Sequence, residues 1–204
     1  MRPRRHEDTK KTTRTHEGHE HTKVTNARKA TKDTKEDPLI IRLAEDGDLN
    51  RVMQLLADCI AGMRTAGIDQ WDTIYPSRDT FSADIGTRTL YLASVDPPGE
   101  LAGVVVINDY QNPEYAAVPW TIDSVRIGVV HRLMVATAYQ GRGVARALMA
   151  FAEARSRELG YDVIRLDAFT RNPRALRLYV GLGYRDAGAV TFRKGVFRCF
   201  EKAL

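Results

Sequence analysis

Hydrophobic and polar positions follow two different periodic patterns along the chain from Pro38 onward. Short apolar runs or strict alternation predict β-strands, and apolar residues spaced three and four apart predict helices. The first pattern predicts strands at Leu39–Leu43, Thr89–Val95, Leu101–Asn108, Ile127–Val135, Val163–Leu166, Arg185–Val190 and Val196–Lys202. The second predicts helices over Leu49–Met63, Arg78–Ile85 and Gly143–Leu159, and a fourth that starts at Pro173 and ends around Gly181–Gly183. Helices interleaved with about seven strands are typical of a mixed α/β fold.

Capping and turn residues fix several of these boundaries. Asp46 or Asp48 offers an N-cap for the first helix, and Gly67 suits the C′ position that ends it. Asn172 followed by Pro173 is a cap with proline at the first helical position. The segment 96–99, Asp-Pro-Pro-Gly, predicts a turn between the second and third strands.

Residues 1–37 have a different composition. They contain eight Thr, four of the five His, and almost no large apolar side chain. Such a segment buries too little surface to offset its ordering entropy, which predicts a disordered tail before a domain over residues 38–204. Three imidazoles at His16, His19 and His21 are compatible with a metal, although a solvated polar tract is the favoured interpretation and no metal is expected.

Charge and composition limit the function classes. The net charge is +5, but residues 1–37 carry eleven Lys/Arg against seven Asp/Glu, so the rest of the chain is nearly neutral. We therefore expect no broad nucleic-acid-binding face on the domain. No run of apolar residues is long enough to span a membrane. The first residues lack the apolar core of a secretory signal, and they carry more acidic residues than a transit peptide does. Two cysteines are too few for a disulfide framework. The expected location is the cytoplasm.

A glycine-rich turn joins the strand at Ile127–Val135 to the helix that follows. Residues 140–145 read Gln-Gly-Arg-Gly-Val-Ala. A turn of this kind at a helix N-terminus gathers unpaired backbone N–H groups beside the positive end of the helix dipole, which suits a phosphate. The Walker motif is absent, and Arg146 stands where a dinucleotide-binding motif needs its last glycine. Taken alone, the turn is also compatible with a tight loop whose glycines allow close packing.

The surrounding residues make the turn more specific. Gln140-x-x-Gly143-x-Ala145, followed some thirty residues later by Asn172-x-x-Ala175-x-x-x-Tyr179, resembles the GCN5-related N-acetyltransferase (GNAT) superfamily, in a bacterial small-molecule branch. The resemblance covers roughly residues 39–204. It implies a GNAT fold, with helices on both faces of a mixed sheet and two strands that splay apart to admit the cofactor.

The resemblance also implies acetyl-CoA as co-substrate. The backbone of the turn would hold the pyrophosphate, and that of the preceding strand would pair with the pantetheine arm. Asn172 would bind the cofactor near its thioester. The implied cofactor-binding residues are Leu133, Met134, Val135, Gln140, Gly141, Arg142, Gly143, Val144, Ala145, Arg146 and Asn172.

Acetyl transfer to an amine needs a base, donors for the developing oxyanion, and an acid for the departing sulfur. The resemblance gives the acid role to Tyr179, which helical spacing alone would place in the core. His131 is the one histidine of the domain, and the unperturbed pKa of a histidine suits proton removal. Side chains alternate along a strand, however, so half of all strand positions face away from any one cleft. Asp167, at a strand end, and Glu114 are rival bases.

Aromatic residues in two segments are candidates for the acceptor pocket. Trp71 and Tyr75 follow the first helix, where the superfamily commonly builds its substrate wall, and Tyr115 and Trp120 precede the catalytic strand. Ordinary loop anchoring explains these aromatics about as well.

The resulting prediction is an N-acetyltransferase that transfers acetyl from acetyl-CoA to a primary amine of a small acceptor by direct attack in a ternary complex. The sequence leaves a homodimer open. A non-catalytic acyl-CoA sensor and a basic-tailed nucleic-acid-binding protein are the alternatives.

Overall fold

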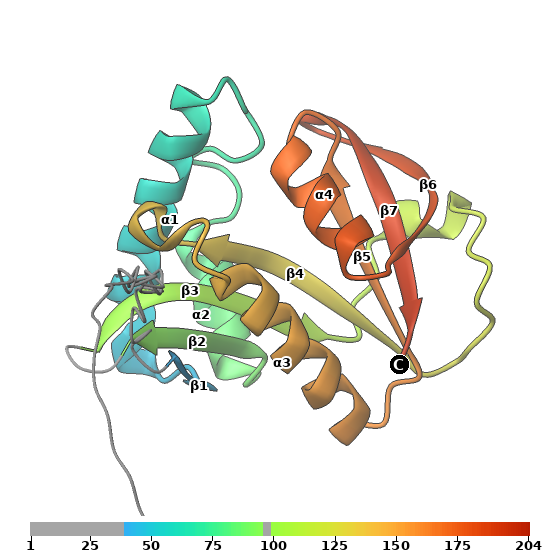
Figure 1. The fold of residues 1–204 in the computed structure, drawn as a ribbon, viewed down its shortest axis with the longest axis horizontal. Helices are drawn as coiled ribbons and strands as arrows, with labels where there is room; N and C mark the ends of the chain where they lie inside the picture. The colour runs from blue at the N-terminus through green and yellow to red at the C-terminus, as the bar shows by residue number, and fades with distance from the viewer. Residues whose placement is uncertain (1–38, 96–98) are drawn as a thin grey trace, which may run out of the picture. The chain divides into compact units, whose positions relative to one another are not determined.

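One seven-stranded sheet organises the chain, in the order β1-β2-β3-β4-β5-β7-β6 (Figure 1). It is seen in a computed structural model that describes residues 39–95 and 99–204. The strands are β1 (Leu39–Leu43), β2 (Leu90–Val95), β3 (Glu100–Asn108), β4 (Ile127–Val135), β5 (Val163–Phe169), β6 (Arg185–Phe192) and β7 (Gly195–Ala203). Only β4 and β5 pair in parallel, and every other pair in the sheet is antiparallel. The predicted mixed sheet is confirmed.

Within the described ranges, four α-helices cover the two faces of this sheet. They are α1 (Leu49–Thr65), α2 (Arg78–Gly86), α3 (Val144–Glu158) and α4 (Pro173–Gly181). Alternate residues of β2 and β3 divide the core, because Leu92 and Val104 pack with α1 and α2 whereas Ala93 and Val105 pack with α3. Helices therefore lie on both faces, with α3 and α4 on the same side (Figure 1).

The helix boundaries agree closely with the capping signals, with one correction. The Asn172 side-chain oxygen accepts a hydrogen bond from the Ala175 N–H at 3.2 Å and so caps α4. Gly67 follows the last residues of α1 with φ +72°, as a C′ glycine does. Neither candidate aspartate caps α1 through its side chain. Asp48 ends a short 3-10 helix, η1 (Asp46–Asp48), and its carboxylate is engaged by Arg42 and by the Glu45 N–H.

Strands β4 and β5 separate after three residue pairs. Their register runs from Ile127 opposite Val163 to Val129 opposite Arg165 and then stops. Beyond that point β4 stays paired with β3, and β5 stays paired with β7 as far as Phe169. The predicted splay is confirmed, and the facing edges of β4 and β5 form the two sides of a V.

Some predictions fall on residues that the structure does not describe. The tail over residues 1–37, its histidine cluster and the turn residues 96–98 lie outside the described ranges, so the two-part division of the chain stays a prediction. In the described part, no helix is long and apolar enough to cross a membrane.

Candidate active site

A β-bulge in β4 shapes one side of the V. Residues 104 and 106 of β3 pair with Met134 and His131, so Arg132 and Leu133 together oppose the single residue at position 105. Arg132 has φ +48°, a left-handed conformation that is uncommon for a residue with a side chain. His131 lies opposite Val106, which faces α1 and α2, and the guanidinium of Arg132 reaches Asp84 of α2. The bulge therefore brings two consecutive side chains to the same face.

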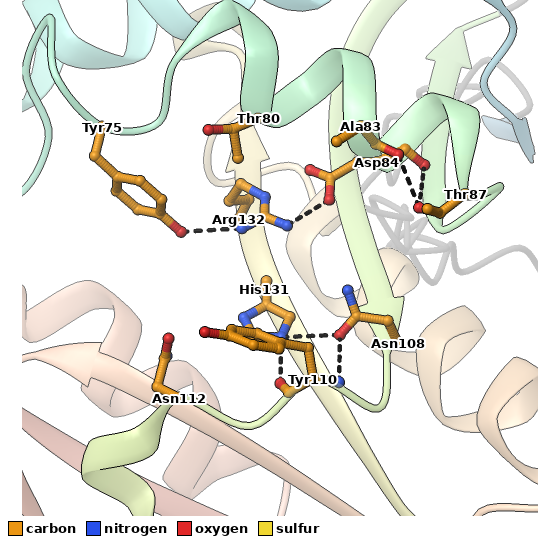
Figure 2. Close-up of a pocket in the computed structure, with 10 residues that line it drawn as sticks. All are labelled: Tyr75, Thr80, Ala83, Asp84, Thr87, Asn108, Tyr110, Asn112, His131 and Arg132. Atoms are coloured by element: carbon orange, nitrogen blue, oxygen red, sulfur yellow. Dashed lines mark hydrogen bonds and ion pairs between the residues drawn. The ribbon is translucent and has the colours of Figure 1, made fainter.

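These two side chains line a cavity of about 420 Å³ (Figure 2). Its walls come from α2, the loop before α2, the end of β3 and the bulge of β4. The lining residues are Tyr75, Thr80, Ala83, Asp84, Thr87, Asn108, Tyr110, Asn112, His131 and Arg132. Arg132 donates to Asp84 at 2.6 Å and to the Tyr75 hydroxyl at 2.9 Å, so the charges of this wall are paired.

His131 is held at the cavity in a neutral form. Its Nε2 lies 3.1 Å from both the Asn108 side-chain oxygen and the Tyr110 carbonyl oxygen. A carbonyl can only accept, so Nε2 carries the proton and Nδ1 keeps its lone pair. Burial, helped by the positive charge of Arg132, lowers the pKa of His131 to about 4. The imidazole is an acceptor at neutral pH but a weak base.

Asp167 is the main ionisable group on the other side of the V. It lies near the end of β5, is half-buried, and accepts a hydrogen bond of 2.7 Å from the Tyr115 hydroxyl. Burial raises the pKa of Asp167 to about 6, although the Tyr115 bond opposes the shift. A carboxylate with a pKa this close to neutrality is well matched to accepting a proton.

Tyr179 approaches Asp167 from α4. The ring of Tyr179 packs near Tyr184 and Phe200, with centroids 6.0 Å and 5.8 Å away. Its pKa is raised, first by burial and then by the negative charge of Asp167. Tyr115, Asp167 and Tyr179 therefore form one electrostatic cluster, because both hydroxyls respond to the same carboxylate.

The glycine-rich turn has the geometry of an anion site. Gly141 and Gly143 have φ of +79° and +83°, and a Cβ built on either would meet nothing within 4 Å. Helix α3 starts at Val144, so its first-turn N–H groups lack acceptors within the helix. The Gln140 side chain donates to the Val135 carbonyl and accepts from Arg174, which ties the turn to β4 and α4. An open, left-handed turn beside free N–H groups suits a pyrophosphate.

Comparison with known proteins shows the family to which the chain belongs. The Acetyltransferase (GNAT) family matches residues 50–184. The chain belongs to the GNAT acetyltransferase family. A search of curated proteins finds no match. Members of the GNAT family transfer acetyl groups from acetyl-CoA.

Solved structures agree with this assignment. A GNAT-family acetyltransferase from Streptococcus agalactiae is 25% identical with a TM-score of 0.70, over 81% of this chain and 95% of that one. A GNAT-family acetyltransferase from Listeria monocytogenes is 23% identical with a TM-score of 0.66, over 81% and 95%. An acetyltransferase from Salmonella typhimurium, solved with acetyl-CoA, is 19% identical with a TM-score of 0.60, over 81% and 94%. The two less similar structures support the fold alone.

The residues predicted to hold the GNAT cofactor lie along a single path. Leu133, Met134 and Val135 are on β4 beyond its last pair with β5, and the segment 140–146 continues from them. The side chain of Asn172 is already engaged, since it caps α4 and donates to the Gln70 side chain at 3.1 Å. Contact between Asn172 and the cofactor would use its remaining amide hydrogen.

The predicted acceptor residues are only partly brought together. Tyr75 lines the cavity beside His131. Trp120 lines a second hollow of about 320 Å³, together with Tyr115, and stacks under the Arg165 guanidinium at 4.2 Å. Trp71 is instead buried in the core beneath α1 and α2, and Glu114 is exposed and lines neither hollow.

Sequence reasoning missed Asp84, and it did not recognise Arg132 as a site residue. Asp84 lies three residues after Phe81 and just before Ile85, both buried, so a carboxylate at that helical position was a signal. His131 and Arg132 are consecutive polar residues in an otherwise apolar strand, a pattern that indicates a bulge. Tyr115 was a candidate for the acceptor pocket, but its hydrogen bond to Asp167 left no signal in the sequence, because the two residues are 52 positions apart. In the part of the chain that the structure describes, no cluster of His, Cys, Asp and Glu could hold a metal ion.

Proposed function

We propose that this GNAT protein is an N-acetyltransferase that acetylates a primary amine of a small acceptor by direct attack in a ternary complex. The observation that carries the proposal is the V between β4 and β5, with the cavity beside His131 on one side and Asp167, Tyr115 and Tyr179 on the other. Bound acetyl-CoA supplies the thioester that is attacked and the thiolate that leaves.

Asp167 accepts the proton of the acceptor amine, directly or through a water. An alkyl ammonium with a pKa of ~10.4 is mostly protonated at neutral pH, so a base is needed. The pKa of about 6 at Asp167 makes it the stronger of the two candidate bases, since His131 has a pKa of about 4. The lone pair on Nδ1 of His131 remains to orient the amine as a hydrogen-bond acceptor.

Tyr179 donates a hydrogen bond, and then a proton, to the departing sulfur. Its raised pKa keeps the hydroxyl protonated throughout the physiological range. Backbone N–H groups of β4 beyond the bulge are available on the edge that faces the V, where they stabilise the developing oxyanion.

The acceptor cavity favours a small amine with a polar body. Its one carboxylate and its guanidinium are paired with each other, its histidine is neutral, and the other polar groups are hydroxyls and amides. At the rim, Tyr75 and Tyr110 are substantially exposed and offer aromatic surface. A strongly charged acceptor body would have no counter-charge in this lining.

The proposal is tested in two steps. Thermal unfolding with and without acetyl-CoA shows binding, and release of free thiol over a panel of small amines, with mass detection of the acetylated product, shows transfer. We expect stabilisation by acetyl-CoA and amine-dependent thiol release that yields an amide. Binding without turnover across the panel would favour the acyl-CoA sensor, and absence of binding would contradict both interpretations.

A further inference from the structure

Arg132 is held in a conformation that its own backbone disfavours. Among the described residues, two that are not glycine have positive φ, Arg88 at +58° and Arg132 at +48°. A Cβ makes the left-handed region unfavourable, so a residue stays there only where its surroundings hold it. Arg88 lies in the exposed turn between α2 and β2, whereas Arg132 lies inside a strand of the active site.

Two contacts hold the side chain of Arg132. One terminal nitrogen donates to the Asp84 carboxylate on α2 at 2.6 Å, and the other donates to the Tyr75 hydroxyl at 2.9 Å (Figure 2). The side chains of Arg132 and Asp84 are only 10% and 9% exposed. Both partners belong to elements outside the sheet, so the pair connects the bulge of β4 to α2 and to the loop before it.

This ion pair is poorly optimised for stability. Burial raises the pKa of Asp84 even though Arg132 attracts the carboxylate, so desolvation outweighs the attraction. Asp84 Oδ2 and Arg132 Nε are buried without a hydrogen-bond partner among the residues that the structure describes. Buried pairs with unsatisfied atoms contribute little net stability, and strain kept at a site is a sign of function.

The bulge at Arg132 decides where two groups of the site lie. Upstream, His131 stays in register with Val106 and faces the cavity. Downstream, one extra residue shifts the strand, so the backbone from Leu133 onward continues along the edge that faces the V. A β4 strand without the bulge would turn every later side chain to the opposite face, because side chains alternate along a strand.

We propose that the Asp84–Arg132 ion pair is a clamp that holds the β4 bulge, which makes Arg132 a positioning residue for acetyl transfer. The inference rests on the proposed function. Arg132 acts through its backbone: the clamp fixes the left-handed conformation, and that conformation sets the positions of His131 and of the Leu133 N–H. Glycine adopts positive φ without strain, so glycine at this position needs no clamp.

The test compares glycine with alanine in purified full-length protein. Arg132→Ala removes the clamp and keeps the strain, so we expect kcat to fall roughly 10- to 100-fold, as for a displaced reacting geometry. Arg132→Gly removes both clamp and strain and should recover most of that loss. In the wild-type background, Asp84→Asn should lower kcat about as much as Arg132→Ala does. In the Arg132→Gly background, Asp84→Asn should lower kcat by less than about threefold, because both changes act through the same backbone angle.

Arg88 provides the matched control. Arg88→Ala and Arg88→Gly alter the same kind of left-handed residue outside the cavity lining, so they should differ in stability and not in kcat. Equal kcat for Arg132→Ala and Arg132→Gly, or an undiminished effect of Asp84→Asn in the Arg132→Gly protein, would overturn the clamp.

Hydrogen exchange of the free protein gives a readout that does not depend on turnover. The β4 amides that flank the bulge should exchange faster in Arg132→Ala and Asp84→Asn than in the wild type, and near the wild-type rate in Arg132→Gly. Unchanged exchange in all variants would contradict the clamp. If the variants show this exchange pattern but the wild-type protein acetylates no amine, the clamp is supported and the proposed acceptor chemistry is contradicted.

Discussion

Tyr179 combines a buried aromatic ring with a hydroxyl in the field of Asp167. Tyr179→Phe removes the hydroxyl and keeps the ring contacts with Tyr184 and Phe200. We expect a folded protein with near-normal acetyl-CoA binding and kcat reduced roughly 10²-fold or more, within the range for a lost general acid. Steady-state kinetics with isothermal titration of acetyl-CoA separate the two quantities.

The neighbouring ring supplies the control for that experiment. Tyr184→Phe also removes a buried tyrosine hydroxyl from the same aromatic cluster, so it should leave kcat near the wild-type value. A fully active Tyr179→Phe enzyme would mean that solvent protonates the sulfur and that Tyr179 only packs. Acyl donors with better leaving thiols should reduce the defect of Tyr179→Phe.

The hydrogen bond between Tyr115 and Asp167 should be visible in the pH dependence of turnover. Asp167 accepts a proton only when ionised, so kcat should fall as pH drops through a pKa near 6. The Tyr115 bond stabilises the ionised form, so Tyr115→Phe raises the pKa of Asp167 and moves the fall in kcat to higher pH. The Tyr115–Trp120 ring contact survives the substitution.

Asp167→Asn and His131→Ala distinguish the two candidate bases. The first should lower kcat strongly and abolish the acid limb near pH 6, whereas the second should mainly raise the KM for the acceptor. If kcat instead falls near pH 4, and this fall disappears in His131→Ala, then His131, whose pKa is about 4, is the base.

Among the elements, the start of α3 gives the most direct test of cofactor binding. Gly143 has φ +83° and open space around its missing Cβ. Asn tolerates this conformation better than a β-branched residue, so Gly143→Asn places a side chain in the anion site with little strain. We expect acetyl-CoA affinity to fall roughly tenfold or more, as for one charge-assisted hydrogen bond of about 1.5–3 kcal/mol.

The other end of the same helix offers the control. Gly160 follows α3 with φ +85° and likewise has nothing within 4 Å of a built Cβ. Gly160→Asn should therefore match Gly143→Asn in thermal stability while keeping wild-type acetyl-CoA affinity. Loss of affinity in both variants would indicate a general effect on α3 and not a phosphate contact.

The loop between α1 and α2 is joined to the hairpin of β6 and β7 by ion pairs. Arg193 bonds Asp72 at 2.8 Å, and Lys194 contacts both Asp69 and Asp72 at 2.8–2.9 Å. The loop also carries Tyr75 of the acceptor cavity. Asp72→Ala removes the carboxylate that both cations share, so we expect a several-fold rise in acceptor KM with little change in acetyl-CoA affinity, measured by initial rates.

Salt and a second aspartate check this prediction. The exposed partners in the network are screened by ions, so raising ionic strength should increase acceptor KM in the wild type and have less effect in Asp72→Ala. Asp162→Ala breaks an exposed ion pair with Arg126 before β4 and should leave acceptor KM unchanged. An Asp72→Ala enzyme with wild-type KM would show that the ion pairs do not position Tyr75.

For the whole molecule, every group proposed for the site lies within residues 39–204. Deletion of residues 1–37 should therefore leave acetyl-CoA affinity and kcat unchanged, because the turn proposed to bind the anion and the V are retained. Most of the net positive charge lies in residues 1–37, so any DNA binding should disappear with them and weaken steeply with salt. Salt-resistant DNA binding by the shortened chain would contradict the enzyme-first interpretation.

Elements with local causes were predictable from the sequence. The limits of β4, Ile127–Val135, follow from its apolar run, and the start of α4 follows from the Asn172 cap. Strand β5 extends three residues past its predicted end because β7 pairs with it as far as Phe169. Asp48 occupies the predicted N-cap position of α1, but its side chain does not cap the helix, because Arg42 binds the carboxylate instead.

The sequence by itself determined the class of fold and the position of the glycine turn, because each depends on residues close together in the chain. Only the tertiary structure decided which polar residues act together. The left-handed Arg132 depends on Asp84, 48 residues away. The pKa of Asp167 is raised by burial, and the hydrogen bond from Tyr115, 52 residues away, opposes that shift. The burial of Trp71 likewise depends on which helices pack over it. Long-range partners and desolvation set these properties, and neither leaves a local pattern in the sequence.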